Sequence, residues 1–91
     1  MSGFRRGGGG RRRDGNEPDV VDAFNALGWV VFRIGATGLP DLLVTRRGIW
    51  KPVEVKQPGK SLTPEQEATR RIAYFDVVEG AADVHGLAWT S

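Results

Sequence analysis

Two acidic residues and a lysine are spaced so that they can act together on one phosphate group. Asp41 follows Pro40 at the start of one apolar run, and Glu54 and Lys56 lie at the end of the next. Because side chains alternate between the two faces of a strand, Glu54 and Lys56 project to the same side. Two neighbouring carboxylates repel each other unless a proton or a cation intervenes. The pattern therefore favours a cation held by carboxylates beside a lysine, and metal-dependent phosphodiester hydrolysis is the leading hypothesis.

The residue types also narrow the choice of cation. Mg²⁺ and Mn²⁺ take oxygen ligands from one or two carboxylates, from water and from substrate phosphate. The chain has no cysteine and one histidine, so we expect no zinc centre, no disulfide and no thiol catalysis. Mg²⁺ or Mn²⁺ is the expected cofactor.

A β-hairpin is expected to bring the two acids together. Two runs of largely apolar residues, separated by a short glycine-containing segment, indicate strands: 41–45 and 49–56. With a two-residue turn at 47–48, Arg46 pairs with Ile49, and Asp41 then lies directly opposite Glu54. A three-residue turn would shift the pairing by one position and would still leave the carboxylates within reach of a shared cation.

A helix is expected before the first strand. Asn16 suits the N-cap position, and Gly28 is a natural stop. The apolar stripe of this helix, extended backwards by three residues, reaches Glu17; its members are Val20, Phe24 and Leu27. Glu17 therefore has two interpretations. It complements the helix dipole, or it turns toward the site as a third carboxylate.

A second helix is expected to begin at Pro64. Thr63 and Gln66 match a capping box, in which each side chain bonds to the other residue's backbone. We expect the apolar positions of this segment to cover one face of a sheet and its arginines to face outward. The apolar positions are Ala68, Ile72 and either Tyr74 or Phe75, and the arginines are Arg70 and Arg71. Lys60, in the preceding loop, is either a phosphate contact or an ordinary surface lysine.

The complete pattern predicts a mixed α/β domain. Residues 29–34 indicate a mostly buried first strand, 75–78 a fourth strand and 79–87 a short final helix. The order αβββαβα predicts a small sheet shielded by helices. The tryptophans are expected in the core or in an interface, and the one histidine on the last helix; these are Trp29, Trp50, Trp89 and His85.

The N-terminal segment differs from the rest in composition. Residues 1–16 hold five arginines and one aspartate, and are expected to form a disordered tail; the arginines are Arg5, Arg6, Arg11, Arg12 and Arg13. Such a tail either grips nucleic-acid phosphates without sequence preference or is simply solvated. No apolar stretch is long enough to span a bilayer and no secretory signal is recognisable. We therefore expect a soluble intracellular protein, in a bacterial cytoplasm or on its nucleoid.

Three segments, taken in order, resemble the virus-type replication-repair nuclease (VRR-NUC) domain of the PD-(D/E)XK nuclease superfamily. They are Gly-Leu-Pro-Asp-Leu-Leu-Val at 38–44, Val-Glu-Val-Lys at 53–56 and Leu-Thr-Pro-Glu-Gln at 62–66. The resemblance covers about residues 17–84 and implies a nuclease domain over 17–91. Only seven residues separate Gln66 from Tyr74, whereas the second helix is usually longer in this family.

The resemblance implies a restriction-endonuclease-like core, of order αβββαβ with a short C-terminal helix, and a role for each matching residue. Asp41 and Glu54 would bind the metal together with the backbone carbonyl of Val55. Lys56 would position the attacking water or act as its base. The family's accessory acid and glutamine match Glu17 and Gln66, although the capping box explains Gln66 equally well.

The expected function is a metal-dependent DNA endonuclease, acting as a homodimer. Two sites related by a two-fold axis suit a branched substrate such as a four-way junction. Two alternatives remain. The chain is a non-catalytic nucleic-acid-binding module, or it is a nuclease subunit that needs a helicase or another replication or repair partner.

Overall fold

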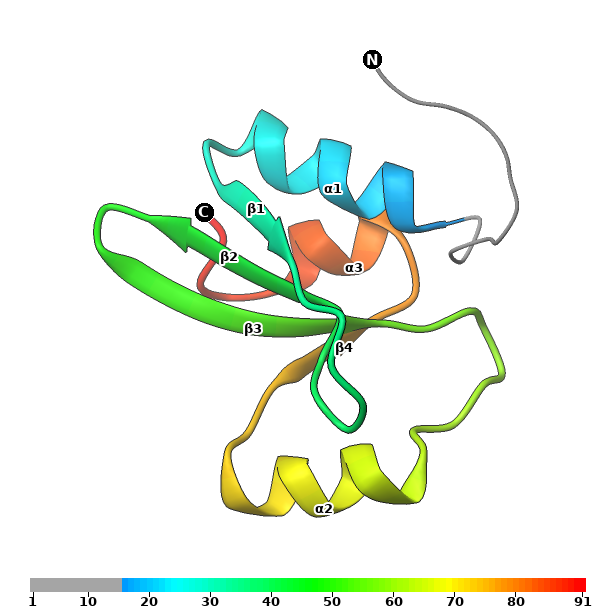
Figure 1. Cartoon of the computed structure of the whole chain (residues 1–91). Helices are drawn as coiled ribbons and strands as arrows, with labels where there is room; N and C mark the ends of the chain where they lie inside the picture. The colour runs from blue at the N-terminus through cyan, green and yellow to red at the C-terminus, as the bar shows by residue number, and fades with distance from the viewer. Residues whose placement is uncertain (1–15) are drawn as a thin grey trace.

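A four-stranded sheet with helices at its sides and end forms the body of the protein (Figure 1). The computed structural model describes residues 16–91. The elements in chain order are α1 (Glu17–Ala26), β1 (Val30–Arg33), β2 (Leu42–Arg46), β3 (Ile49–Val55), α2 (Pro64–Ile72), β4 (Asp76–Val78) and α3 (Ala81–Gly86). This is the order expected from the sequence, and the fold class, mixed α/β, is confirmed.

The sheet follows chain order, β1-β2-β3-β4, with antiparallel pairs except for the parallel pair β3 and β4. Arg46 pairs with Ile49 across a two-residue turn, as expected. Arg47 and Gly48 in this turn have φ of 55° and 80°. Positive φ at both central residues is the geometry that suits the twist of a hairpin. The register of the whole hairpin is therefore set by its own turn.

One face of the sheet carries the hydrophobic core. α1 and α3 lie together over this face (Figure 1). The side chains that meet there are buried and come from α1, α3, the strands β2, β3 and β4, and the residue before β1: Val20, Ala23, Phe24, Trp29, Leu42, Val44, Val53, Val55, Val78 and Val84. Trp89, near the C-terminus, packs on the rings of Phe24 and Trp29. Alternation along β2 and β3 thus directs Leu42, Val44, Val53 and Val55 into the core.

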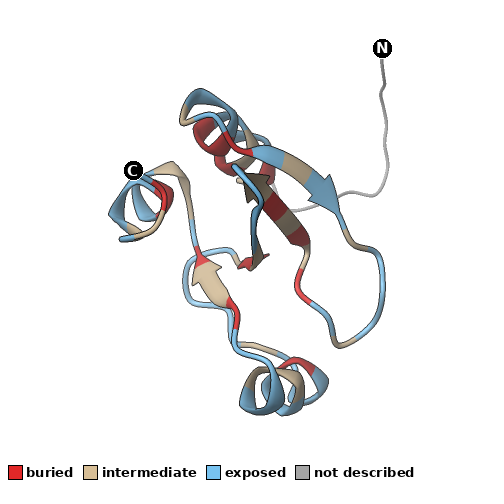
Figure 2. Ribbon diagram, turned by 90° about the vertical axis from the view of Figure 1, so that its left-hand side faces the viewer, coloured by how far each residue is buried: buried red, intermediate tan, exposed pale blue. Residues whose placement is uncertain are grey.

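The opposite face of the sheet is largely uncovered. Figure 2 shows β1 as mostly exposed, and Val30, Phe32 and Trp50 are each about half exposed. The expectation of a buried first strand was therefore wrong. β1 is an edge strand, and helix α2 does not lie over it. The expectation that the apolar positions of the α2 segment are covered holds only for Phe75, which is buried, because Ala68 is exposed, Ile72 is 88% exposed and Tyr74 is 65% exposed.

Helix α2 instead stands beyond the end of the sheet, beside the loop that joins β1 to β2 (Figure 1). In that loop Gly38 has φ of 82°, and a Cβ atom there would lie 3.3 Å from the Cβ of Glu65. The loop and the helix therefore pack closely where Gly38 has no side chain. α2 closes the sheet end at which Asp41 and Glu54 lie.

Helix α1 begins and ends near the expected residues. Gly28, with φ of 88°, follows its last turn and stops it. Asn16 occupies the N-cap position but its side chain makes no cap hydrogen bond. Its Nδ2 instead donates to the carbonyl oxygens of Lys56 and Glu79, at 3.0 and 2.6 Å. Asn16 therefore ties α1 to the ends of β3 and β4.

Within residues 16–91, none of the helices has the length and apolar character needed to cross a bilayer. The five tail arginines proposed as phosphate contacts lie outside the described residues: Arg5, Arg6, Arg11, Arg12 and Arg13.

Candidate active site

The carboxylates of Asp41 and Glu54 each accept a hydrogen bond from a backbone N–H group of the hairpin region. The Asp41 N–H donates to Oε1 of Glu54 at 3.0 Å, and the Val55 N–H donates to Oδ2 of Asp41 at 3.2 Å. The neighbouring pair in the register is Leu42 with Val53, so Asp41 follows opposite Glu54. Both acids lie on the side of the sheet opposite the core, because Leu42 and Val53 point into the core. The hairpin thus brings the two carboxylates together at one end of the sheet.

Lys56 and Gln66 complete the surroundings of Glu54. Nζ of Lys56 lies 3.2 Å from Oε2 of Glu54, and the Lys56 side chain is 16% exposed. The Gln66 side chain also lies close to the Glu54 carboxylate, where its amide lowers the pKa of that carboxyl. Its Oε1 at the same time accepts from the Thr63 N–H, while the Thr63 hydroxyl accepts from the Gln66 N–H. The two interpretations of Gln66 are therefore compatible, since one side chain caps α2 and contacts Glu54.

The environment of Glu54 disfavours its negative charge. Its side chain is almost fully buried. Burial raises the pKa of the Glu54 carboxyl, and the neighbouring Asp41 carboxylate raises it further. The hydrogen bonds and charge of Lys56, together with the Gln66 amide, oppose this shift in pKa without cancelling it. A cation between the two carboxylates would relieve the same repulsion, so this donor set suits a divalent metal ion.

Glu17 is buried at the start of α1 and accepts a 2.9 Å hydrogen bond from Nε of Arg33. Arg33 is the last residue of β1, and Asn16 beside Glu17 bonds to the Lys56 carbonyl. Glu17 is thus placed at the same end of the sheet as Asp41 and Glu54. Nevertheless, no cluster of three or more acidic, histidine or cysteine side chains suited to a metal ion occurs within residues 16–91.

The metal ligands expected from the sequence are therefore brought together only in part. Asp41 and Glu54 form a pair, and Val55 follows Glu54 with its N–H on Asp41. Two carboxylates are enough for Mg²⁺, which keeps several waters and binds substrate phosphate directly. The described geometry fits such an ion on Asp41 and Glu54, with Glu17 near the same end of the sheet.

Three other residues considered in the sequence analysis, Lys60, His85 and Trp50, are exposed. Lys60 is exposed in the loop between β3 and α2. His85 is exposed on α3, and Trp50 is exposed at the hairpin end of the uncovered face.

Three residues that position the site were missed by sequence reasoning. Gly38 has no side chain, so α2 can pack closely against the loop that leads to Asp41. Arg33 donates a hydrogen bond to Glu17, and Asn16 donates one to the Lys56 carbonyl. A glycine three residues before Asp41 was a usable signal, because glycine often marks a close approach of two segments. The contacts of Arg33 and Asn16 join residues far apart in the chain and left no local signal.

Comparisons of the chain with family models, with curated proteins and with solved structures found no match. The candidate site is therefore interpreted from its own geometry. The VRR-NUC resemblance stays a prediction carried by the motif residues.

Proposed function

We propose that this protein is a metal-dependent DNA endonuclease of the PD-(D/E)XK type. The observation that carries the proposal is the contact of Lys56 with a buried Glu54 that lies opposite Asp41. A buried carboxylate with a raised pKa, next to a second carboxylate and a lysine, lowers the stability of the folded protein when it is charged. Such arrangements occur preferentially at functional sites.

The proposed chemistry assigns one task to each side chain. Bound Mg²⁺ or Mn²⁺ would supply an acidic water and neutralise charge on the phosphoryl group. Asp41 and Glu54 hold the cation through carboxylate oxygens. Lys56 has three N–H donors, of which one is directed at Glu54, so the others can contact a phosphate oxygen or the attacking water. Gln66 orients the Glu54 carboxylate from α2.

The uncovered sheet face supports self-association as part of this function. Val30, Phe32 and Trp50 are each about half exposed, and the rings of Phe32 and Trp50 stack at 5.9 Å. Register places Leu43 and Pro52 on the same face. These five side chains, here called the apolar face, carry no charge, so two copies can meet there without electrostatic repulsion. Protein surfaces that bind DNA are strongly basic, and the apolar face has no basic side chain. A second copy of the chain therefore fits this face better than DNA does.

The area of the apolar face also suits a second copy. An aromatic side chain exposes about 150–250 Å² when free, so half-exposed Phe32 and Trp50 supply roughly 150–250 Å² per copy. That is enough for the centre of an interface of about 800 Å² per partner. In such a pair each copy brings one site, which suits the two cuts that a four-way junction requires.

A second candidate function follows from the same hydrogen bonds. One oxygen of Glu54 and one of Asp41 accept backbone N–H groups, so both acids stabilise the sheet end without any metal. This favours a DNA-binding module that does not cut, or a subunit that cuts only with a helicase or another partner.

Cleavage assays separate these functions. Labelled linear, flapped and four-way DNA should be incubated with Mg²⁺ or Mn²⁺, beside EDTA and Lys56→Ala controls. The nuclease predicts cleavage that is lost in both controls, while the Lys56→Ala protein still binds DNA. Binding without cleavage under every metal would favour the binding module or the partner-dependent subunit. Equal cleavage of all three substrates would contradict the preference for junctions.

A further inference from the structure

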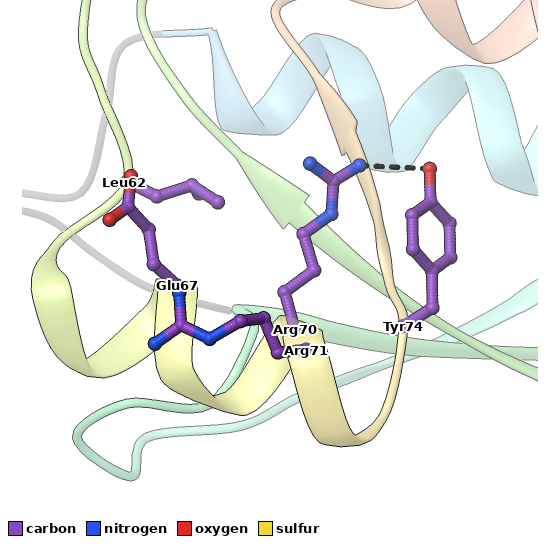
Figure 3. A pocket seen from close by; sticks show the side chains of 5 residues that line it. All are labelled: Leu62, Glu67, Arg70, Arg71 and Tyr74. Carbon is purple, nitrogen blue, oxygen red and sulfur yellow. Dashed lines mark hydrogen bonds between the residues drawn. The ribbon is translucent and has the colours of Figure 1, made fainter.

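We propose that Arg70 binds a DNA phosphate close to the one at the candidate metal site of Asp41 and Glu54, in a pocket formed by α2 and the segments that flank it. This inference rests on the proposed function, since it assigns a second contact to the same substrate. The pocket has a volume of about 420 Å³ and is lined by Leu62, Glu67, Arg70, Arg71 and Tyr74. Figure 3 shows the Arg70 guanidinium extending from α2 toward Tyr74, with Leu62 approaching from the loop before the helix.

Arg70 is held in one orientation by neighbours on two sides. Its Nε donates to the Phe75 carbonyl and its Nη2 to the Tyr74 hydroxyl, both at 2.8 Å. Its guanidinium also lies 4.5 Å from the Tyr74 ring centroid and 5.7 Å from that of Phe75. The expectation that Arg70 simply faces outward was therefore wrong. A guanidinium fixed in advance loses little freedom when it binds a ligand.

The fixed guanidinium retains binding capacity. Arginine has five N–H donors, and the two hydrogen bonds above use two of them. The ion pairs within residues 16–91 join Glu17 to Arg33 and Glu54 to Lys56, and neither of them involves Arg70. An arginine held by neutral groups and open on one side is suited to an anion, and phosphate matches its planar donors.

The position of Arg70 connects this pocket to the candidate active site. Arg70 follows Gln66 by four residues, so both side chains lie on the same face of α2, with Cβ atoms about 6 Å apart. Gln66 contacts Glu54. A strand with one phosphate near Glu54 would thus pass along this face of α2 toward Arg70.

Replacing Glu67 should change DNA affinity in the direction opposite to replacing Arg70. It lines the same pocket, is exposed and carries a negative charge that opposes an anion. Removing this charge should therefore strengthen DNA binding. A purely structural role of Arg70 at the end of α2 does not predict that effect.

The experiment measures DNA binding separately from cleavage. The full chain carrying Lys56→Ala binds a fluorescein-labelled linear duplex, and anisotropy gives Kd over a range of salt concentrations. Adding Arg70→Ala should weaken binding about tenfold and reduce the slope of log K against log salt by about 1. Adding Glu67→Gln should strengthen it about twofold to threefold. Ile72→Ala, on the same helix but outside the pocket, is the matched control and should change neither quantity.

The outcomes distinguish this inference from the proposed nuclease. Arg70→Ala binding as tightly as Ile72→Ala would overturn the inference, as would no effect of Glu67→Gln. DNA binding that depends on Arg70 in a chain that never cuts would overturn the nuclease and leave the phosphate contact standing. If Arg70→Ala does not fold, Arg70→Lys replaces it. That variant keeps the charge but not the planar donors, and should weaken binding less than tenfold without changing the salt slope.

Discussion

The backbone N–H of Asp41 lies 3.0 Å from Oε1 of Glu54, and this contact joins the two candidate metal ligands before any metal is bound. The return contact, from the Val55 N–H to Asp41, fixes the other carboxylate. Both contacts span the hairpin whose register is set by its two-residue turn. The site therefore forms as the hairpin forms, and changes to either acid affect stability as well as chemistry.

Glu54→Gln is expected to stabilise the metal-free protein at neutral pH. The folded protein raises the pKa of the Glu54 carboxyl, so it holds this proton more tightly than the unfolded chain does. The stabilisation that results is complete below the unfolded pKa and is lost as pH rises through the folded pKa. Glutamine stays neutral, so the variant should have a higher Tm than the wild type at pH 7.

Thermal unfolding in EDTA between pH 4 and pH 8 checks this expectation. The advantage of Glu54→Gln should shrink toward acid pH, where the wild-type carboxyl is also protonated. Adding Mg²⁺ should raise the Tm of the wild type more than that of the variant, because an ion that binds the folded state stabilises it. A variant less stable than the wild type at pH 7 would show that Glu54 is stabilising when charged.

Substitutions at Gln66 and Thr63 separate capping from the site role. Thr63→Ala removes one hydrogen bond of the capping box and should cost about 1 kcal/mol with little change in cleavage rate. Gln66→Glu keeps an acceptor for the Thr63 N–H but places a carboxylate against Glu54. We expect this variant to retain helix α2 and to lose at least tenfold in cleavage rate. Equal cleavage by the two variants would reduce Gln66 to a helix cap.

Gly38→Ala is expected to impair the site from outside it. Alanine disfavours the φ of 82°, and its Cβ would press on Glu65 in α2 at 3.3 Å. The helix should shift and weaken the contact between Gln66 and Glu54. Circular dichroism should show a folded protein destabilised by about 1 kcal/mol or more, with slower cleavage. Gly35→Ala, in the same loop with open space around it, is the matched control and should behave as wild type.

Sedimentation of the full chain tests self-association through the apolar face. The wild type should reach about twice its mass of 9.9 kDa as concentration rises. Trp50→Ser should keep it at the monomer mass, whereas Ile72→Ser, at a more exposed apolar position on α2, should not.

Because the chain has no cysteine, disulfide cross-linking of a Thr45→Cys variant offers a second measurement of self-association. Thr45 lies beside Trp50 in the register, so oxidation should link two copies there but not through Ala82→Cys on α3. A monomer at every concentration would contradict the dimer.

Local patterns in the sequence determined the element order and the pairing of the acids. The turn at Arg47 and Gly48 sets the hairpin register through its own backbone conformation, so Asp41 could be placed opposite Glu54 without knowledge of the fold. The capping box at Thr63 and the glycine stop at Gly28 are likewise local. Short-range geometry of this kind depends on residues a few positions apart, which the sequence displays directly.

Only the tertiary structure decided which surfaces are covered. Helix α2 was expected over the sheet, and its place beyond the sheet end leaves Trp50 exposed and Ile72 without a core to join. It also turns Arg70 back toward Phe75. Burial depends on how separate elements pack against one another, and periodicity along one element does not contain that information. The candidate site residues could therefore be identified from the sequence, whereas their burial and their contacts with other elements could be determined only from the folded structure.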